Sequence, residues 1–202
     1  MHSNVAPVII LIRHGQSTTN QRGLLVGRSD PPLTELGREQ AMQLQQFLSG
    51  VREVWSSPLE RAITTARLAV PALDPVVKQS FIEVDYGSLD GVSLASITDD
   101  QWRDFEGDHQ RPLLDGESLL AVDGRVYGEL DALLSDSTSL VHRDDEHLAI
   151  VSHVSPIKSA ITWALGVDGS AAWRMRIDNG SMTWIATRRS TPAVIRANVV
   201  PF

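Results

Sequence analysis

The sequence of 202 residues contains no cysteine. Disulfide bonds and chemistry at a thiolate are therefore excluded. A long apolar run is also missing, since the longest one near the start, residues 5–12, is about half as long as a membrane span. No basic segment precedes this run, and Arg13 and His14 follow it at once. We therefore expect no signal peptide and no membrane contact, and a soluble cytoplasmic protein is the default.

Positive charge is scarce as well, because 18 Lys and Arg stand against 25 Asp and Glu, a formal charge of −7. The deficit is local: residues 88–136 hold twelve acidic and three basic side chains, a balance of −9, and the rest of the chain has a balance of +2. An acidic protein is not expected to bind nucleic acid or an anionic membrane. With 42% hydrophobic and 21% charged residues, the composition is that of a globular protein.

Short apolar runs alternate with amphipathic segments along the chain. The runs at residues 5–12, 53–55, 75–84, 148–152, 182–187 and 193–200 are expected to be strands or extended segments. Helices are expected after the caps Thr34, Ser57 and Ser155, with Pro58, Glu60 and Pro156 in first turns and Gly50 and Gly166 as stops. This alternation predicts a three-layer α/β/α sandwich with a mostly parallel central sheet. We expect one domain, residues 1–202, with an acidic helical elaboration at about 88–136.

Polar side chains follow three of the expected strands, where each strand leads into a helix. Arg13, His14, Ser17 and Asn20 come after the first strand, Arg61 opens the helix after the second, and His153 follows residues 148–152. Ligands of such sheets collect at the carboxyl ends of the strands. Each residue alone has a plain structural explanation, as a capping or solvated side chain.

Together, these residues indicate phosphoryl transfer through a histidine. A neutral imidazole can attack phosphorus, and arginines can hold the equatorial oxygens. Glu83, near the end of an extended segment, can protonate the departing oxygen. This chemistry requires that His14 be neutral, which neighbouring Arg13 and Arg61 favour, and that Glu83 hold a proton near neutral pH.

Several motifs, in order, resemble those of the histidine phosphatase superfamily, also called the phosphoglycerate-mutase-like family. The matching stretches are Arg13-His14-Gly15-Gln16-Ser17 with Asn20, Pro32 through Ala41, Ser56-Ser57-Pro58 with Arg61-Ala62 and Thr65-Ala66, Glu83 with Tyr86-Gly87 and Asp90-Gly91, Gly116-Glu117-Ser118, and His153. The resemblance extends from His14 to about Asn179. It implies the phosphoglycerate-mutase-like variant of the α/β/α fold.

The resemblance also implies a role for each site residue. His14 would become phosphorylated, Arg13, Arg61 and His153 would bind the phosphoryl oxygens, and Glu83 would act as general acid and then general base. Asn20 would be a further polar contact and Ser17 a weaker candidate. No metal and no organic cofactor is implied. Many members have glycine after the second histidine, where this chain has Val154, so we expect a different turn or one that needs no positive φ.

Three functions remain open: a phosphatase for a small phosphorylated metabolite, a cofactor-dependent phosphoglycerate mutase, and a catalytically silent phosphate-binding or regulatory module. The mutases compared carry a longer, arginine-bearing insertion after the position of Glu83, whereas residues 88–136 are short and acidic, which favours the phosphatase. If this segment covers the site, it should disfavour multiply phosphorylated substrates. Residues 142–147 have metal-ligand types but are expected to form a solvated loop, and Arg188-Arg189 a turn. A monomer or a homodimer is expected.

Overall fold

The computed structural model describes residues 7–112, 114–187 and 191–201. Six strands form one sheet in the order β3-β2-β4-β1-β5-β6. Strands β1 to β4 run parallel to one another, and β5 and β6 add antiparallel pairs beyond β1. The strands are β1 (Val8–Arg13), β2 (Val51–Ser56), β3 (Val76–Val77), β4 (His147–Ser152), β5 (Met182–Ala186) and β6 (Ala193–Val199). The sheet is mostly parallel, as the sequence predicts.

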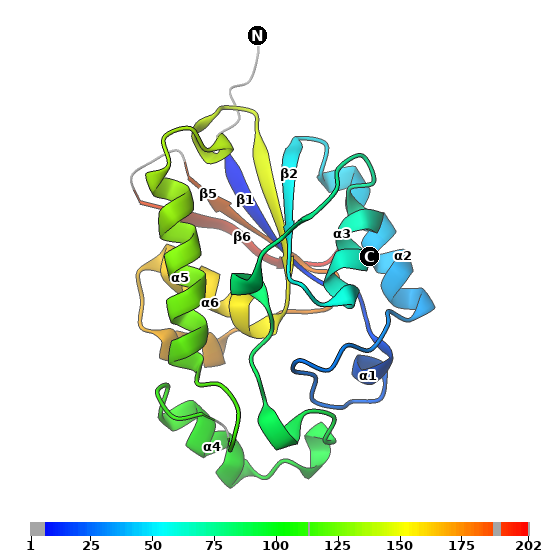
Figure 1. Ribbon diagram of the computed structural model, residues 1–202, viewed down its shortest axis with the longest axis vertical. Coiled ribbons are helices and arrows are strands. Elements are labelled where there is room, and N and C mark those ends of the chain that lie inside the picture. The colour runs from blue at the N-terminus through cyan, green and yellow to red at the C-terminus, as the bar shows by residue number, and fades with distance from the viewer. Residues whose placement is uncertain (1–6, 113, 188–190, 202) are drawn as a thin grey trace.

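Helices cover both faces of this sheet. In Figure 1, α5 and α6 lie on one side of the strands and α2 and α3 on the other, which makes the predicted three layers. The α-helices are α1 (Thr18–Gln21), α2 (Glu35–Gln43), α3 (Glu60–Ala69), α4 (Asp99–Gly107), α5 (Leu119–Ser135) and α6 (Val154–Leu165). Short 3-10 helices are η1 (Leu44–Phe47), η2 (Gln79–Phe81), η3 (Gly87–Leu89), η4 (Leu94–Ser96), η5 (Leu140–His142) and η6 (Gly169–Arg174).

Strand β1 is buried on both faces. Ile9 and Leu11 belong to the apolar core under α5 and α6, while Val8, Ile10 and Ile12 belong to the core under α2 and α3. A strand between two helical layers has no solvent face, which is why its sequence is continuously aliphatic rather than alternating. The first two residues of the predicted strand, at 5 and 6, lie outside the described residues.

The predicted helix boundaries are partly wrong. Thr34 caps α2 as expected, accepting the Gly37 N–H at 3.0 Å, and Gly166 ends α6 with φ of 63°. Ser57 does not cap α3, which starts at Glu60 after Leu59, and no capping box forms there. Ser155 lies inside α6, whose N-cap is His153. As described below, the Ser57 hydroxyl contacts His153, and at the start of α6 the Glu83 carboxylate accepts the backbone N–H groups that a capping side chain would accept.

Two further expectations are corrected. The extended segment at 75–84 is strand only at β3 and continues as η2, which turns the chain toward Glu83. The helical spacing of Leu36, Ala41, Leu44 and Leu48 predicts one apolar stripe after Thr34; the last three are buried, but Leu36 is 47% exposed. Residues 88–136 form η3, η4, α4 and α5, with α5 packed against α6.

The carboxyl ends of the parallel strands all face the same edge of the sheet. From β1 and β4 the chain continues into the lower half of the molecule in Figure 1, where α1 and α4 lie. Of the helices in the described ranges, none has the length and apolar character needed to cross a bilayer.

Candidate active site

His14 follows β1 directly and is 3% exposed. Its backbone N–H donates to the Ser152 carbonyl oxygen at 3.0 Å, which fixes it to the end of β4. Its Nδ1 lies 2.7 Å from the Gly15 carbonyl oxygen. Because a carbonyl oxygen can only accept, Nδ1 carries the proton in this contact, and Nε2 of the neutral ring holds a lone pair. Nε2 is therefore the ring nitrogen that can act as a nucleophile.

Arg61, the second residue of α3, contacts that atom. Its Nε donates to His14 Nε2 at 3.3 Å, and the guanidinium is 1% exposed. The other two nitrogens donate to the Ser29 carbonyl at 2.6 Å and the Gly27 carbonyl at 2.8 Å. The guanidinium is thus held on both sides, with one edge on the imidazole and the other on a loop.

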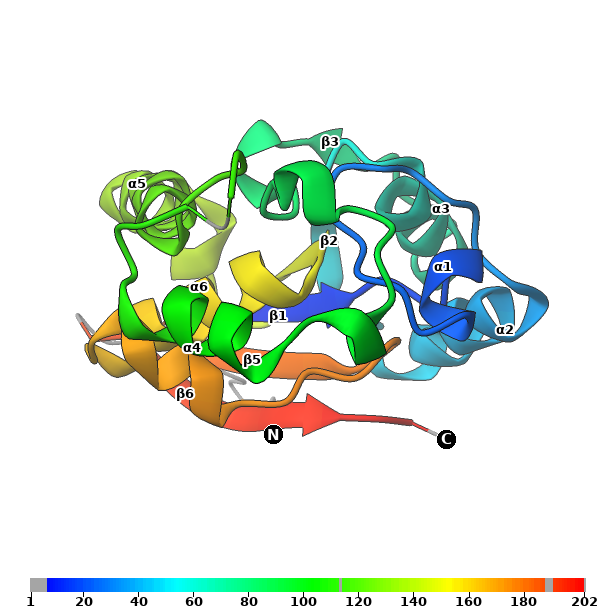
Figure 2. The same cartoon turned by 90° about the horizontal axis from the view of Figure 1, so that it is seen from below.

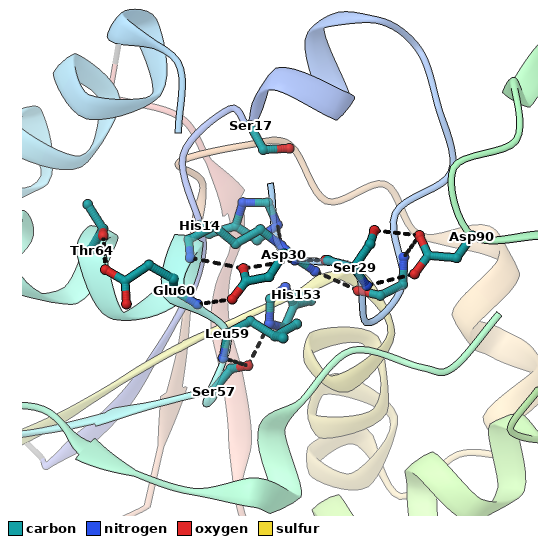
Figure 3. A network of polar contacts seen from close by, with 12 residues as sticks. His14, Ser17, Ser29, Asp30, Ser57, Leu59, Glu60, Thr64, Asp90 and His153 are labelled. Carbon is teal, nitrogen blue, oxygen red and sulfur yellow. Dashed lines mark hydrogen bonds and ion pairs between the residues drawn. The ribbon is translucent and has the colours of Figure 1, made fainter. Parts of the chain in front are cut away.

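The loop that holds Arg61 is itself anchored by two carboxylates, as Figure 3 shows. Asp90 accepts the backbone N–H of Gly27 and both the N–H and the hydroxyl of Ser29, at 2.7 to 3.1 Å. Asp30 accepts the Glu60 N–H at 2.7 Å and lies 3.5 Å from the Arg61 guanidinium. These contacts fix the carbonyl oxygens that orient Arg61.

His153 lies opposite His14, with ring centroids 5.0 Å apart. It is completely buried, and its Nε2 contacts the Ser57 hydroxyl at 2.7 Å (Figure 3). This contact explains why Ser57 is not the helix cap that the sequence predicts. His153 Nδ1 is buried without a hydrogen-bond partner among the described residues. An unpaired buried nitrogen makes His153 a candidate ligand contact.

Arg13, the last residue of β1, is the second cation of the site. One of its terminal nitrogens donates to the Ile177 carbonyl at 2.7 Å, and its Nε is buried without a partner in the described ranges. Burial lowers the pKa of Arg13 to about 10, so it remains charged at neutral pH. Gly180 N–H donates to the Arg13 carbonyl at 3.1 Å, and the Asn179 amide donates to the His14 carbonyl at 3.2 Å.

Both histidines are held neutral. Burial, followed by the charges of Arg61 and Arg13, lowers the pKa of His14 well below its usual value of 6.5. Burial, together with Arg61 and His14, lowers the pKa of His153 in the same way. A neutral His14 is what nucleophilic attack requires.

Glu83 is the buried carboxylate of the site, at 4% exposure. Backbone N–H groups of its own neighbour Val84 and of Val154 and Ser155 donate to it at 2.8, 3.1 and 3.2 Å. The last two are the free N–H groups at the start of α6, so the Glu83 carboxylate takes the place of a capping side chain there. Val154 has helical rather than positive φ, so valine fits where many family members have glycine.

Ser17 and Asn20 mainly stabilise the loop after β1. Ser17 is the N-cap of α1, and its hydroxyl both accepts the Asn20 N–H at 3.2 Å and donates to Asn20 Oδ1 at 2.9 Å. Asn20 Oδ1 also accepts from the Asn179 amide at 3.2 Å. The structure therefore gives Ser17 a capping contact and links Asn20 to the segment that holds His14.

Gly15 meets protein rather than open space. A Cβ at Gly15 would clash with the carbonyl of Gly37, and a Cβ at Gly37 would clash with the carbonyl of Gln16. The first and second sequence motifs therefore pack backbone against backbone. This packing sets the position of His14.

The other clusters that the sequence singles out lie outside this site. His142 contacts the Leu134 carbonyl at 3.0 Å, and a turn separates it from β4. Among the residues that the structure describes, no three His, Asp or Glu side chains are arranged to hold a metal ion. Arg188 and Arg189 fall outside the described residues.

The fold and the site together define a class of protein: an α/β/α sandwich with a buried cluster of two histidines and two arginines at the carboxyl edge of the sheet. The chain belongs to the histidine phosphatase superfamily (branch 1), whose family model matches residues 9–200. This membership confirms the family and the fold that the sequence predicts.

Named relatives fall on both sides of the phosphatase and mutase division. Phosphoserine phosphatase 1 of Hydrogenobacter thermophilus is 31% identical over 201 residues, covering 95% of this chain and 92% of that protein. A probable phosphoglycerate mutase, GpmB, of Cronobacter sakazakii is 28% identical over 190 residues, covering 90% and 86%. The solved phosphoserine phosphatase of Entamoeba histolytica superposes with a TM-score of 0.85 at 23% identity, covering 96% and 98%, which shows the shared fold.

Sequence reasoning missed several supporting residues. Local sequence predicts a helix cap at Ser57 and indicates no role for Asp30 or Asp90, although Asp90 stands in a matching motif. Asn179 marks only the end of the resemblance. Each of these residues acts through a contact between distant segments, for which local sequence gives no signal.

Proposed function

We propose that this protein is a phosphomonoesterase that works through a phosphohistidine on His14. The observation that carries the proposal is the neutral imidazole of His14. Its Nδ1–H donates to the Gly15 carbonyl oxygen, and its Nε2 lies against the Arg61 guanidinium. A phosphatase activity is supported by membership of the histidine phosphatase superfamily and by the phosphatase among its named relatives.

In the first step, His14 Nε2 attacks phosphorus, and the bond from phosphorus to the alcohol oxygen breaks. Glu83 gives its proton to that oxygen, so the alcohol leaves neutral and a phosphohistidine remains. In the second step, Glu83 removes a proton from water, whose oxygen attacks phosphorus. The bond to Nε2 then breaks, inorganic phosphate leaves, and both side chains return to their starting state.

Two cationic donors and one neutral donor stabilise the equatorial oxygens of the phosphoryl group in both steps. Arg61 and Arg13 supply positive charge, and His153 supplies the N–H of its Nδ1. The neutral ring carries its proton on Nδ1 when its other nitrogen, Nε2, accepts a hydrogen bond from the Ser57 hydroxyl. Asn20 is a further polar contact through its amide group, and Ser17 acts by positioning Asn20. Preorganised donors of this kind lower the barrier because they need no reorientation during reaction.

A cofactor-dependent phosphoglycerate mutase is the second candidate, supported by the similarity to GpmB of Cronobacter sakazakii. A mutase must retain a bisphosphorylated intermediate, which extra cations near the site would favour. The segment at 88–136 instead has a balance of −9, and two of its basic residues, Arg103 and Arg125, are paired with Asp100 and Glu117. A silent phosphate-binding module is the third candidate.

The substrate is proposed to be a small phosphorylated metabolite, and the name of the Hydrogenobacter thermophilus relative makes O-phosphoserine one compound to test. We further propose a cytoplasmic, metal-independent enzyme, a monomer or a homodimer, without nucleic-acid or membrane partners. The chain would form one domain, in which residues 88–136 border the active site.

The test is a phosphate-release screen over sugar phosphates, phosphoglycerates, nucleotides and phosphopeptides, with His14→Ala as control. We expect release by the native protein, none above background by His14→Ala, acid-labile ³²P on the native protein after quenching, and full activity after exhaustive chelation. Fast interconversion of 3- and 2-phosphoglycerate with little release would support the mutase instead. Equal phosphate release by the native and His14→Ala proteins would refute the phosphohistidine mechanism. If the native protein hydrolysed none of the esters, the catalytically silent phosphate-binding module would be the remaining candidate.

A further inference from the structure

A pocket of about 160 Å³ lies at the N-terminal end of α6, between α4, α5 and η6. Figure 2 shows these segments gathered at one end of the molecule. Four aromatic side chains line the pocket: Tyr86, Trp102, Phe105 and Trp173. The Trp173 ring stands edge-on to Phe105 and Trp102, with centroids 5.2 and 6.2 Å apart. Large apolar ring faces therefore dominate this wall.

Polar groups line the same pocket at one side. Asp123 accepts from the Ser159 hydroxyl at 2.5 Å and lies 3.1 Å from His109 Nε2. His109 Nδ1 and Trp173 Nε1 are buried and have no hydrogen-bond partner in the described parts of the chain. A mostly apolar concavity with a few convergent polar groups is typical of a site for a small organic molecule.

The pocket adjoins the candidate catalytic acid. Val154 and Ser155, which line it, are the residues whose N–H groups donate to Glu83. In the mechanism proposed above, Glu83 protonates the oxygen that leaves phosphorus. In that mechanism the alcohol part of the substrate extends from Glu83 away from His14, and Val154 and Ser155 link Glu83 to the aromatic pocket.

We propose that this pocket binds the alcohol part of the substrate and selects phosphate monoesters whose alcohol carries a planar, mostly apolar ring. This inference rests on the phosphatase function proposed above. The volume of the pocket suits one six-membered ring, since an engineered protein cavity of about 150 Å³ binds benzene. The aromatic side chains would contact the ring of the ligand, while Lys158, whose Nζ lies 5.4 Å from the Trp173 ring centroid, and the unpartnered nitrogens of His109 and Trp173 would meet a polar substituent.

The hydrolysis test compares benzyl phosphate with ethyl phosphate, both esters of primary alcohols. We expect kcat/KM to favour the benzyl ester by at least about tenfold, which corresponds to burial of part of a ring. Ala172→Phe, which fills the pocket, should bring this ratio close to one, and Ala171→Phe, a neighbour outside the lining, should keep it. A native ratio near one, or a tenfold preference for O-phosphoserine or 3-phosphoglycerate over benzyl phosphate, would overturn the inference.

A binding test separates this inference from the phosphatase proposal. In the His14→Ala protein, calorimetry should give tighter binding of benzyl phosphate than of ethyl phosphate by about tenfold, with no need for turnover. Trp173→Leu, which keeps apolar bulk but removes the ring faces, should reduce this preference and serves if Ala172→Phe does not fold. If the His14→Ala protein prefers benzyl phosphate but the native protein hydrolyses no ester, the pocket proposal is supported and the phosphatase proposal is refuted. If the native protein hydrolyses esters but the His14→Ala protein shows no binding preference, the phosphatase proposal is supported and the pocket proposal is refuted.

Discussion

Arg61 is a buried cation oriented chiefly by neutral carbonyl oxygens. Gly27 and Ser29 accept from its two terminal nitrogens, while the Asp30 carboxylate is 3.5 Å away. A close carboxylate would compete with a phosphoryl group for the charge, whereas carbonyl oxygens fix the orientation and leave the charge available. This arrangement requires the planar fork of arginine, which lysine lacks.

Replacing Arg61 by lysine tests this requirement. Arg61→Lys should lower kcat/KM by about a hundredfold, because a point charge cannot contact His14 and both carbonyls at once. Arg67→Lys, at the exposed end of the same helix, is the matched control and should leave kcat/KM within a factor of about two. Steady-state assays with 4-nitrophenyl phosphate give both values. Equal activity of the two variants would mean that the geometry of Arg61 is unimportant.

Ser57 provides a second residue-scale test. Ser57→Ala removes the partner of His153 Nε2 and should lower kcat/KM by about tenfold, the value of one hydrogen bond to a buried group. Ser56→Ala is the control, since that equally buried hydroxyl donates to the Ser57 carbonyl and, among the described residues, does not contact His153. A vanadate binding assay should show the loss for Ser57→Ala alone. If Ser56→Ala loses as much, the effect is on packing and not on His153.

The two buried histidines also predict how stability depends on pH. Folding lowers the pKa of His14 and His153 well below 6.5, so in acid the unfolded chain binds protons that the folded chain does not. The contribution of the two histidines to the free energy of unfolding is complete above pH 6.5. It is lost as the pH falls from 6.5 toward their pKa values in the folded protein. The limiting slope is about 1.4 kcal/mol per pH unit for each histidine.

Urea unfolding at pH 7.5 and 5.5 measures this dependence. We expect the native protein to lose stability at pH 5.5, and His14→Asn and His153→Asn each to lose less, because one titrating group is removed. His142→Asn, at an exposed position, should behave like the native protein. If all four proteins lost the same free energy of unfolding between pH 7.5 and 5.5, groups other than His14 and His153 would be responsible for the pH dependence.

At the scale of elements, backbone contacts between motifs fix the site. Gly15 and Gly37 pack so closely that a side chain on either would clash with the backbone of the other motif. The turn after β1 therefore has one permitted position against α2. This contact, rather than an approach of the backbone to a ligand, is the structural reason for glycine at position 15.

Two glycine substitutions separate close packing from chain flexibility. Gly15→Ala should lower the free energy of unfolding by about 1–3 kcal/mol, the usual cost of overpacking, and reduce activity. Gly124→Ala, inside α5 with open space around the new methyl group, should raise it by up to about 1 kcal/mol. Chemical denaturation gives both values. A Gly15→Ala protein as stable and active as the native one would contradict the packing argument.

Elements could be predicted from sequence where their signals are local. The aliphatic run of β1 and the Thr34 cap of α2 follow from burial on two faces and from one side-chain hydrogen bond. The predicted caps at Ser57 and Ser155 are wrong because residues far away in sequence intervene: the Ser57 hydroxyl contacts His153, and the Glu83 carboxylate accepts the N–H groups at the start of α6. The positions of Arg13, His14, Arg61 and His153 at strand ends were predictable, but their mutual orientation was not.

At the scale of the whole molecule, the acidity of residues 88–136 is partly internal. Glu117 pairs with Arg28 and Arg125, Glu129 pairs with Lys78, and Asp90 anchors the loop that holds Arg61. These charges stabilise contacts between the segment and the rest of the chain. Asp99, Asp100 and Asp108 are exposed near or on α4, where Asp100 pairs with Arg103 of the same helix.

This charge distribution predicts discrimination against a second phosphate. A bisphosphate brings extra negative charge toward the acidic segment, so we expect its kcat/KM to be below that of the matched monophosphate, by about tenfold at low ionic strength. The difference should shrink as salt is added, since exposed charges are screened. Assays on fructose 1,6-bisphosphate and fructose 6-phosphate at two salt concentrations provide the measurement. A higher kcat/KM for the bisphosphate would contradict the prediction.

The contacts of residues 177–180 with Arg13 and His14 have a consequence for synthesis on the ribosome. A nascent chain that ends soon after residue 160 already contains every residue of the proposed catalytic set. It lacks Ile177, Asn179 and Gly180, whose contacts hold the turn after β1, and it lacks β5, which pairs with β1. The reactive histidine therefore acquires its fixed position only when the last strands emerge, and stalled fragments of the chain should not consume phosphorylated metabolites.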